Sequence, residues 1–384
     1  MNVLHLTPSF YPALFWGGPT ESGYALCRHL SRLGCSVRVL TSNDNGPTVV
    51  DQPTGKDVVL DDGVTVRYCR RVVADIAPAW LAELPRWVRW ADMVHLTAVF
   101  SASTPPALAA AALYRRPVVW TPRGSLQPYG LNRRHAVKRA WLRLCRLVRP
   151  PQLVLHTTSE QEQADTAKTW PYSPSLLIGN GVDIPQRQQR PDRSDPGNLR
   201  LLFLGRLHPI KALENLIAAC LLVPEATLTI AGAGDPTYTR KLQTLVSGLG
   251  LDARVQFPGA VTGAAKEAVF AAADVFVMPS HSENFGMAIA EALARELPVI
   301  ASTGTPWRHL EERGCGLWVD NAPASLADAI RRIAAMPLLE MGCRGRLLME
   351  SQYSWHSRAV EMTRLYERLL RDAAGARNTV EVPL

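Results

Sequence analysis

Two series of short, almost continuous apolar runs, each followed by a helical pattern, constrain this sequence most. The first series is Asn2–Leu6, Val37–Leu40, Met93–Leu96, Val118–Trp120 and Leu153–His156. Such runs are typical of parallel strands that are buried on both faces, because the connecting helices cover the sheet. The sequence therefore predicts an α/β fold.

A second series begins after a polar segment. Residues 186–199 are rich in Gln, Arg, Asp and Pro, which predicts a linker between domains. The strands predicted beyond it are Leu201–Leu204, Thr227–Ala231, Val255–Phe257, Val275–Met278 and Val299–Ile300. The helices predicted over the whole chain are Glu21–Leu33, Ala212–Leu222, Thr239–Leu249, Gly286–Leu297 and His356–Leu370.

The 384 residues suit two domains of this kind. We expect a first domain over residues 1–185, a linker over 186–199 and a second domain over 200–352. The last helix and tail, 353–384, are expected to cross back to the first domain. Doubly wound sheets bind ligands at the carboxyl ends of their strands. We therefore expect the two domains to face each other across a cleft lined by such loops.

The net charge of +8 is concentrated in the first half of the chain. Residues 1–185 hold 20 Lys/Arg against 13 Asp/Glu, whereas residues 186–384 hold 22 against 21. Between Asp92 and Glu160 there are ten Lys/Arg and no acid. A field of one sign attracts phosphates, anionic lipid or nucleic acid.

Cysteine usage and hydropathy predict a cytoplasmic protein. The seven cysteines include no C-x-x-C pair, which argues against a disulfide framework and a zinc site. We see no signal peptide at the N-terminus and no apolar stretch of about 18–20 residues. Membrane contact is therefore expected to be peripheral, on the inner face.

The segment Arg133–Arg149 is the candidate for that contact. It contains seven Lys/Arg and no acid, and Val137, Trp141, Leu144 and Val148 recur at helical spacing. This pattern is typical of a helix that lies on an anionic membrane surface. The alternative is an ordinary amphipathic helix whose apolar stripe packs on the first domain. Both hold if the stripe faces the core while the cations face lipid.

The segment from Met278 to Ala294 carries two carboxylates around a helix start. Glu283 lies in the loop after a strand, the helix begins near Phe285–Gly286, and Glu291 lies in its second turn. The free N–H groups of a helix start attract phosphate or sugar oxygens. Glu283 is suited to accept hydrogen bonds from a sugar, and Glu291 from two vicinal hydroxyls such as those of ribose. The alternative is a helix cap and a solvated acid.

A second segment, Phe203 to Lys211, places two cations after a strand. Gly205 lets the backbone turn, and Arg206 and Lys211 flank the loop that follows. Two cations at this position suit a diphosphate whose charge grows as it leaves. The alternative is a pair of exposed surface cations.

Together these segments resemble the retaining family 4 glycosyltransferases of GT-B fold, over essentially the whole chain. The motifs that carry the resemblance are Gly205-Arg206 with Lys211, Glu283-Asn-Phe-Gly-Met with Glu291, Gly17-Gly18-Pro19, Asn180-Gly181-Val182-Asp183 and Tyr353-Ser-Trp355. The resemblance implies two Rossmann-like domains. The first would bind the acceptor, and the second would bind a nucleotide-diphosphate sugar.

The resemblance also implies residue roles. Arg206 and Lys211 would neutralise the donor diphosphate, Glu283 would hold a donor-sugar hydroxyl, and Glu291 would bind the ribose. Donor contacts are also implied for Gly17, Gly18, Asn284, Phe285, Gly286 and Met287. It implies no cofactor and no metal ion, and a retaining mechanism in which the leaving phosphate oxygen helps to deprotonate the acceptor.

Two positions depart from the family pattern. Lys211 is followed by Ala212 where Lys-Gly is usual, and Arg123 stands where many relatives have a histidine that approaches the donor sugar. Arginine cannot act as a base near neutral pH, so we expect Arg123 to position groups or stabilise charge. The Thr-Pro-Arg-Gly segment resembles bacterial exopolysaccharide and O-antigen transferases, which implies a lipid-linked glycan acceptor.

Two other functions remain as alternatives. A sugar-nucleotide epimerase on the same scaffold would bind the same donor without an acceptor. A basic nucleic-acid binder would fit the charge, but we see no recognised nucleic-acid motif and expect no such partner. Gly232-Ala-Gly234 is interpreted as a glycine turn after a strand, and the nine histidines show no close pairing along the sequence.

Overall fold

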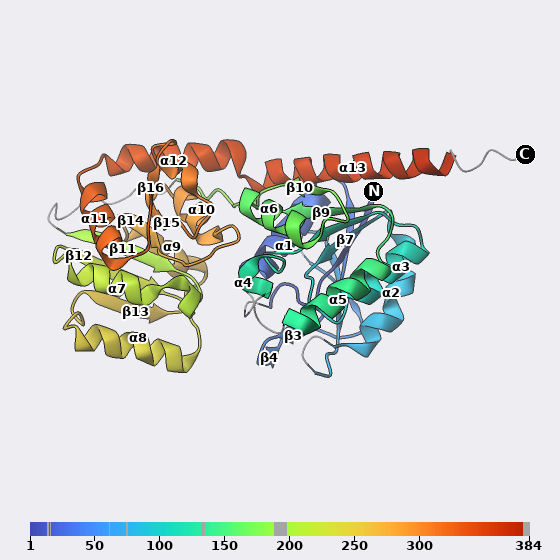
Figure 1. Ribbon diagram of the computed structural model, residues 1–384, viewed down its shortest axis with the longest axis horizontal. Helices are drawn as coiled ribbons and strands as arrows, with labels where there is room; N and C mark the ends of the chain where they lie inside the picture. The colour runs from blue at the N-terminus through green and yellow to red at the C-terminus, as the bar shows by residue number, and fades with distance from the viewer. Residues whose placement is uncertain are drawn as a thin grey trace, which may run out of the picture. The chain divides into compact units, whose positions relative to one another are not determined.

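The computed structural model describes residues 1–13, 15, 17–60, 62–73, 76–131, 135–187 and 198–378 (Figure 1). The chain divides into a first unit, Met1–Gly181 with Trp355–Leu384, and a second unit, Val182–Ser354. The final helix thus begins at Trp355 and belongs to the first unit. Most of the predicted linker, residues 188–197, lies outside the described residues.

The first unit is built on one eight-stranded sheet. All neighbouring strands are parallel except the β5–β6 pair. The strands, in spatial order, are β10 (Ser175–Leu177), β9 (Leu153–Thr157), β8 (Val118–Thr121), β7 (Met93–Thr97), β1 (Asn2–Leu6), β2 (Ser36–Ser42), β6 (Thr65–Cys69) and β5 (Asp57–Val59). A small hairpin, β3 (Asp44–Asn45) and β4 (Thr48–Val49), follows β2.

Helices connect these strands and bury apolar faces on the sheet. In α2, for example, Trp80, Leu84, Trp87 and Val88 are buried, which is the spacing of one helical face. The helices of this unit are α1 (Gly18–Arg32), α2 (Pro78–Trp90), α3 (Thr104–Leu113), α4 (Pro128–Leu131), α5 (His135–Leu147), α6 (Glu160–Thr169) and α13 (Trp355–Asn378).

The second unit contains a six-stranded, fully parallel sheet. Its strands, in spatial order, are β13 (Val255–Gly259), β12 (Ala226–Ala231), β11 (Leu199–Leu204), β14 (Val275–Met278), β15 (Val299–Ser302) and β16 (Gly316–Val319). Counted within the unit this is the order 3-2-1-4-5-6 of a Rossmann fold. The strand order therefore reverses between β11 and β14, where such sheets bind ligands.

The connections of the second unit follow the same α/β alternation. The helices are η2 (Pro209–Lys211), α7 (Leu213–Leu221), α8 (Pro236–Gly248), α9 (Gly263–Ala271), α10 (Met287–Ala294), η3 (Arg308–Leu310), α11 (Pro323–Ala334) and α12 (Leu338–Gln352). Every strand and helix named from the sequence is present, with bounds that differ by up to three residues, except that α13 continues to Asn378 beyond its predicted end at Leu370. The predicted α/β class, with two doubly wound sheets, is confirmed.

Two of the quoted motifs meet around the start of α13. A Cβ atom on Gly181 would lie 2.5 Å from the Trp355 ring, so only glycine fits there. The Val182 amide donates to the Tyr353 carbonyl at 2.7 Å. Gly181 thus packs on Trp355, and Val182 is hydrogen-bonded to Tyr353, although the two motifs are distant in the sequence.

Candidate active site

Arg206 lies in the loop that follows the carboxyl end of β11. The strand order of the sheet reverses between β11 and β14, next to this loop. A Cβ atom on Gly232 would lie 1.8 Å from the Gly205 carbonyl oxygen, and one on Gly234 would lie 1.9 Å from that of Leu207. The two glycines after β12 therefore allow close packing against this loop. The Arg206 side chain is exposed and, within the described part of the chain, forms no ion pair.

Lys211 ends the short helix η2 and points to Glu283. The ammonium Nζ contacts Glu283 Oε1, and the side chains are 16% and 11% exposed. The next residue, Ala212, has a left-handed backbone with φ 51°. A left-handed conformation favours glycine, which accounts for the glycine that is usual at this position in the resembling family.

Glu283 is held by the loop that follows β14. Ser280 Oγ donates to Glu283 Oε1 at 2.7 Å, so that oxygen accepts from both Ser280 and Lys211. The Glu283 amide donates to the Gly304 carbonyl at 2.8 Å. Lys211 and Glu283, which were predicted from segments about 70 residues apart, thus belong to one hydrogen-bonded group. This group lies where the strand order reverses.

The end of β15 and the loop that follows it contact this group. Ser302 Oγ donates to the Ser280 carbonyl at 2.5 Å, and a Cβ on Gly304 would lie 2.4 Å from that same oxygen. Trp307 Nε1 donates to the Phe285 carbonyl at 2.5 Å. Ser302, Gly304 and Trp307 were not among the residues predicted for the site from the sequence.

The start of α10 lies directly after Glu283. Gly286 is its N-cap with φ 82° and ψ 60°, so the chain turns through a left-handed residue before the helix. Phe285 is buried, while Asn284 and Met287 are half-buried. Together they bring the free N–H groups of a helix start next to Lys211 and Glu283, which is the arrangement that favours anions.

Glu291 forms a separate pair. Its Oε1 lies 2.8 Å from the Lys266 Nζ of α9, and within the described residues it makes no contact with Glu283 or Lys211. Lys266 could not be predicted as a site residue, because nothing in its own segment suggests a ligand. The Lys211–Glu283 pair lies before α10, whereas the Lys266–Glu291 pair joins α9 to α10.

In the first unit, Gly17 and Gly18 begin α1 after β1. Gly17 is the N-cap with φ 64° and ψ −134°, a conformation open almost only to glycine. An added Cβ there would meet nothing within 4 Å. Glycine is therefore required at this position by the backbone conformation, because a larger side chain would have room there.

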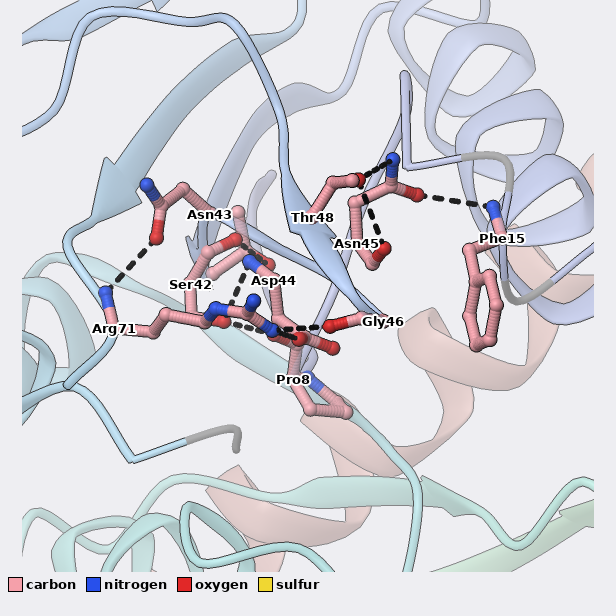
Figure 2. A network of polar contacts seen from close by, with 10 residues as sticks. Pro8, Phe15, Ser42, Asn43, Asp44, Asn45, Gly46, Thr48 and Arg71 are labelled. Carbon is pink, nitrogen blue, oxygen red and sulfur yellow. Dashed lines mark hydrogen bonds and ion pairs between the residues drawn. The ribbon is translucent and has the colours of Figure 1, made fainter. Parts of the chain in front are cut away.

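A polar network ties the loop before Gly17 to its neighbours (Figure 2). The Phe15 amide donates to Asn45 Oδ1 at 3.0 Å, and a Cβ on Gly46 would overlap the Phe15 ring. Arg71 pairs with the buried Asp44 and donates to the Gly46 carbonyl at 2.7 Å. The loops after β1, β2 and β6 are therefore held together at the carboxyl edge of the first sheet.

Arg123 lies in the first unit with φ 53°, another left-handed residue. Its guanidinium donates to Asn180 Oδ1 at 2.6 Å. The buried Glu162 accepts from the Gly124 amide at 2.6 Å and so fixes the turn. Burial lowers the pKa of Arg123 to about 10, so it remains charged near neutral pH.

Three buried histidines lie beside Arg123, a grouping that the sequence spacing did not reveal. The rings of His5 and His95 stack 4.9 Å apart, and those of His95 and His156 are 5.9 Å apart. Burial, and then the Arg123 charge, lower the pKa of His5 and of His156 to about 3. Burial also places the pKa of His95 well below its usual range.

The helix α5 divides into two faces. Cys145 is buried, and Trp141 packs inward with Nε1 donating to the Val99 carbonyl at 2.7 Å. Val137 and Leu144, two of the four apolar residues that recur at helical spacing, are 65% and 42% exposed, and Leu147 is 83% exposed. The outer face thus combines apolar side chains with the exposed Arg139, Arg143 and Arg146. Arg133, from the same segment, lies outside the described residues.

Among the described residues, no group of three or more His, Cys, Asp or Glu side chains is placed to hold a metal ion. Across the same residues, no helix combines the length and the apolar character needed to cross a bilayer.

Two family models match the chain. Residues 16–186 match the model of glycosyltransferase family 4, and residues 198–336 match a model of glycosyl transferases group 1. Gly17 and Gly18 fall within the first match. Arg206, Lys211, Glu283 and Glu291 all fall within the second.

Similar proteins and structures cover nearly the whole chain. A GDP-mannose:cellobiosyl-diphosphopolyprenol alpha-mannosyltransferase of Komagataeibacter xylinus is 27% identical over 96% of this chain and 94% of its own. Sucrose-phosphate synthase from Thermosynechococcus elongatus superposes with a TM-score of 0.75 at 22% identity, covering 97% and 100% of the two chains. Anabaena Alr3699/HepE in complex with UDP-glucose gives 0.73 at 20% identity, covering 96% and 100%.

Proposed function

Because this chain belongs to the family 4 glycosyltransferases of GT-B fold, we propose that it moves a sugar from a nucleotide-diphosphate sugar to a glycan acceptor with retention of configuration. The observation that carries the proposal is the Lys211–Glu283–Ser280 group beside the start of α10. It lies where the strand order of a Rossmann sheet reverses, which is where such sheets bind nucleotides.

The donor would be held by the second unit. Arg206 and Lys211 would face the diphosphate, and the N–H groups at the start of α10 would add further donors. Glu283, oriented by Ser280 and by the Gly304 carbonyl, would accept hydrogen bonds from the sugar. Glu291 would bind the ribose. Two cations and a helix start supply the charge stabilisation that a leaving diphosphate requires.

The chemical step needs no carboxylate nucleophile in this proposal. The bond between the anomeric carbon and the phosphate oxygen breaks, and the acceptor oxygen bonds to the same face. The acceptor proton passes to the leaving phosphate oxygen. Arg123 remains protonated and would stabilise charge, since Asn180 and the Glu162-supported turn hold it in place.

A metal test follows from the two cations. Because Arg206 and Lys211 supply positive charge to the diphosphate, transfer should persist in excess chelator. Release of nucleoside diphosphate, measured with and without EDTA, should differ by less than about twofold. An absolute requirement for manganese or magnesium would contradict the proposed charge stabilisation.

The dependence of donor consumption on an acceptor distinguishes the proposed transferase from the alternative function, a sugar-nucleotide epimerase. A transferase consumes donor much faster when an acceptor is present, whereas an epimerase converts the donor without one. The named relative uses a cellobiosyl-diphosphopolyprenol acceptor. We therefore propose a lipid-linked oligosaccharide acceptor in bacterial surface polysaccharide synthesis, and location on the inner face of the cytoplasmic membrane.

Membrane contact is proposed through the outer face of α5. Leu144 and Leu147 are exposed beside Arg139 and Arg143, so apolar insertion and attraction to anionic lipid act together. Trp141 is excluded as an anchor, because it packs inward.

Vesicle binding tests this surface. The protein should sediment with vesicles that contain anionic lipid and not with neutral ones, and salt should weaken the binding, since each cation near the surface contributes about 1 kcal/mol. Charge reversal at Arg139 and Arg143 should abolish sedimentation. Reversal of Arg332 on α11, an exposed arginine of the second unit, is the control and should change nothing. If the wild type ignores anionic vesicles at low salt, α5 is only a solvated helix.

A further inference from the structure

The ion pair between Lys266 and Glu291 has no assigned role. The two side chains come from α9 and α10, are 23% and 16% exposed, and approach to 2.8 Å. Lys266 belongs to none of the motifs that carry the family resemblance. It nevertheless contacts the carboxylate to which the proposed function assigns the ribose.

Packing of the two helices does not depend on this pair. Arg295, at the end of α10, donates to both oxygens of Glu267 on α9 at 2.9 and 2.6 Å. Its guanidinium also lies 4.6 Å from the centre of the Phe270 ring. This bidentate pair already fixes α9 against α10, so Lys266–Glu291 is available for another role.

The geometry constrains what Glu291 presents to a ligand. Lys266 occupies Oε1, and no donor from the described residues contacts Oε2. A carboxylate held at one oxygen presents the other in a fixed direction, which lowers the entropy lost on binding. The ammonium has three N–H donors, and one of them is used by Glu291. The others are available to ligand oxygens.

We propose that Lys266 is a nucleoside-recognition residue, which orients Glu291 and grips with it the vicinal hydroxyls of the donor ribose. The inference rests on the proposed function and extends it by one residue. Glu291 accepts hydrogen bonds from the two hydroxyls, and Lys266 donates to one of their oxygens. Loss of the 2′-hydroxyl therefore removes much of what the pair recognises.

The test compares ribose with deoxyribose. Calorimetric titrations would use UDP and dUDP, and GDP and dGDP, with the full chain. The wild type should bind the ribonucleotide of one pair more tightly than its 2′-deoxy form. K266M should weaken binding of the ribonucleotide about tenfold and change the dissociation constant of the deoxyribonucleotide by less than about twofold. The ratio of the two dissociation constants should therefore approach one.

Two further variants distinguish the possible failures. K241M removes a comparable pair on the same unit, with Glu214 at 3.2 Å, and should keep the wild-type ratio. If Glu291→Ala lowers the ratio and K266M does not, Lys266 has no part in recognition and the proposed function stands. If the wild type binds none of the four nucleotides, the proposed function fails and the inference fails with it.

Discussion

Replacing Lys211 by alanine should lower turnover at saturating donor by about 10²–10³, the range for losing one preorganised charge-stabilising group. Lys211 lies against Glu283, so the variant removes a cation and also leaves a largely buried carboxylate near the diphosphate. Arg206→Ala should cause a loss in the same range. Arg206 is exposed and unpaired within the described chain, so its variant tests charge alone.

The matched control is Lys241→Ala. Lys241 also pairs with a glutamate of the second unit, but on the outer surface of α8. Its turnover should equal that of the wild type. Circular dichroism and the thermal midpoint should show that all three variants fold. Near-normal turnover of both Lys211→Ala and Arg206→Ala would show that the donor diphosphate binds elsewhere.

Acid should destabilise the first unit at pH values above those at which the surface carboxylates are protonated. His5 and His156 have pKa values lowered by burial to about 3, whereas an unfolded histidine has a pKa of about 6.5. Between these values the unfolded chain binds protons that the folded chain does not. Stability is therefore constant above about pH 6.5 and falls below it, by about 1.4 kcal/mol per pH unit for each histidine.

The hydrogen bonds explain why the neutral form is required. The Ile178 carbonyl is only an acceptor, so His156 Nε2 donates to it at 2.8 Å, and a neutral ring then accepts at Nδ1 from Thr121. His95 Nε2 can donate to Thr121 Oγ1 at 2.8 Å, and the Tyr366 hydroxyl to His95 Nδ1. Every donor and acceptor in this series of hydrogen bonds has a partner only while both histidine rings are neutral.

Urea unfolding from pH 8 to pH 4.5 measures the effect. At pH 5 the neutral burial of His5 and of His156 should each lower the free energy of unfolding by about 2 kcal/mol. This is a large part of the 5–15 kcal/mol typical of a whole domain. His156→Gln keeps a donor and an acceptor, so its stability should depend less steeply on pH. An unfolding free energy that is the same at pH 5 and pH 7 would contradict neutral burial.

The fold was predictable because its signal is local. Runs such as Val275–Met278 are apolar throughout, and a parallel sheet covered on both faces requires that pattern. The shorter elements, including β5 and the β3–β4 hairpin, are only two or three residues long and lack such a run. They were not identified from the sequence.

The candidate site was predictable only where its residues occur in motifs. Glu283 and Lys211 were selected separately, but their contact depends on the neighbouring positions of β11 and β14 in the sheet. Lys266, Ser302 and the histidine group required the fold, because their partners lie 22 to 90 residues away in the sequence. Hydrophobic spacing also did not show that Trp141 packs inward while Val137 is exposed, because it does not tell which residues of α5 pack on the domain.

The account depends most directly on a nucleotide-sugar donor bound by Arg206 and Lys211. The decisive measurement is thermal unfolding of the wild type and of the Arg206→Ala, Lys211→Ala double variant against a panel of nucleotide-diphosphate sugars. One donor at 100 times its dissociation constant should stabilise the wild type by about 2.7 kcal/mol and leave the double variant almost unshifted. Equal stabilisation of both proteins, or none of the wild type by any donor at millimolar concentration, would contradict the account.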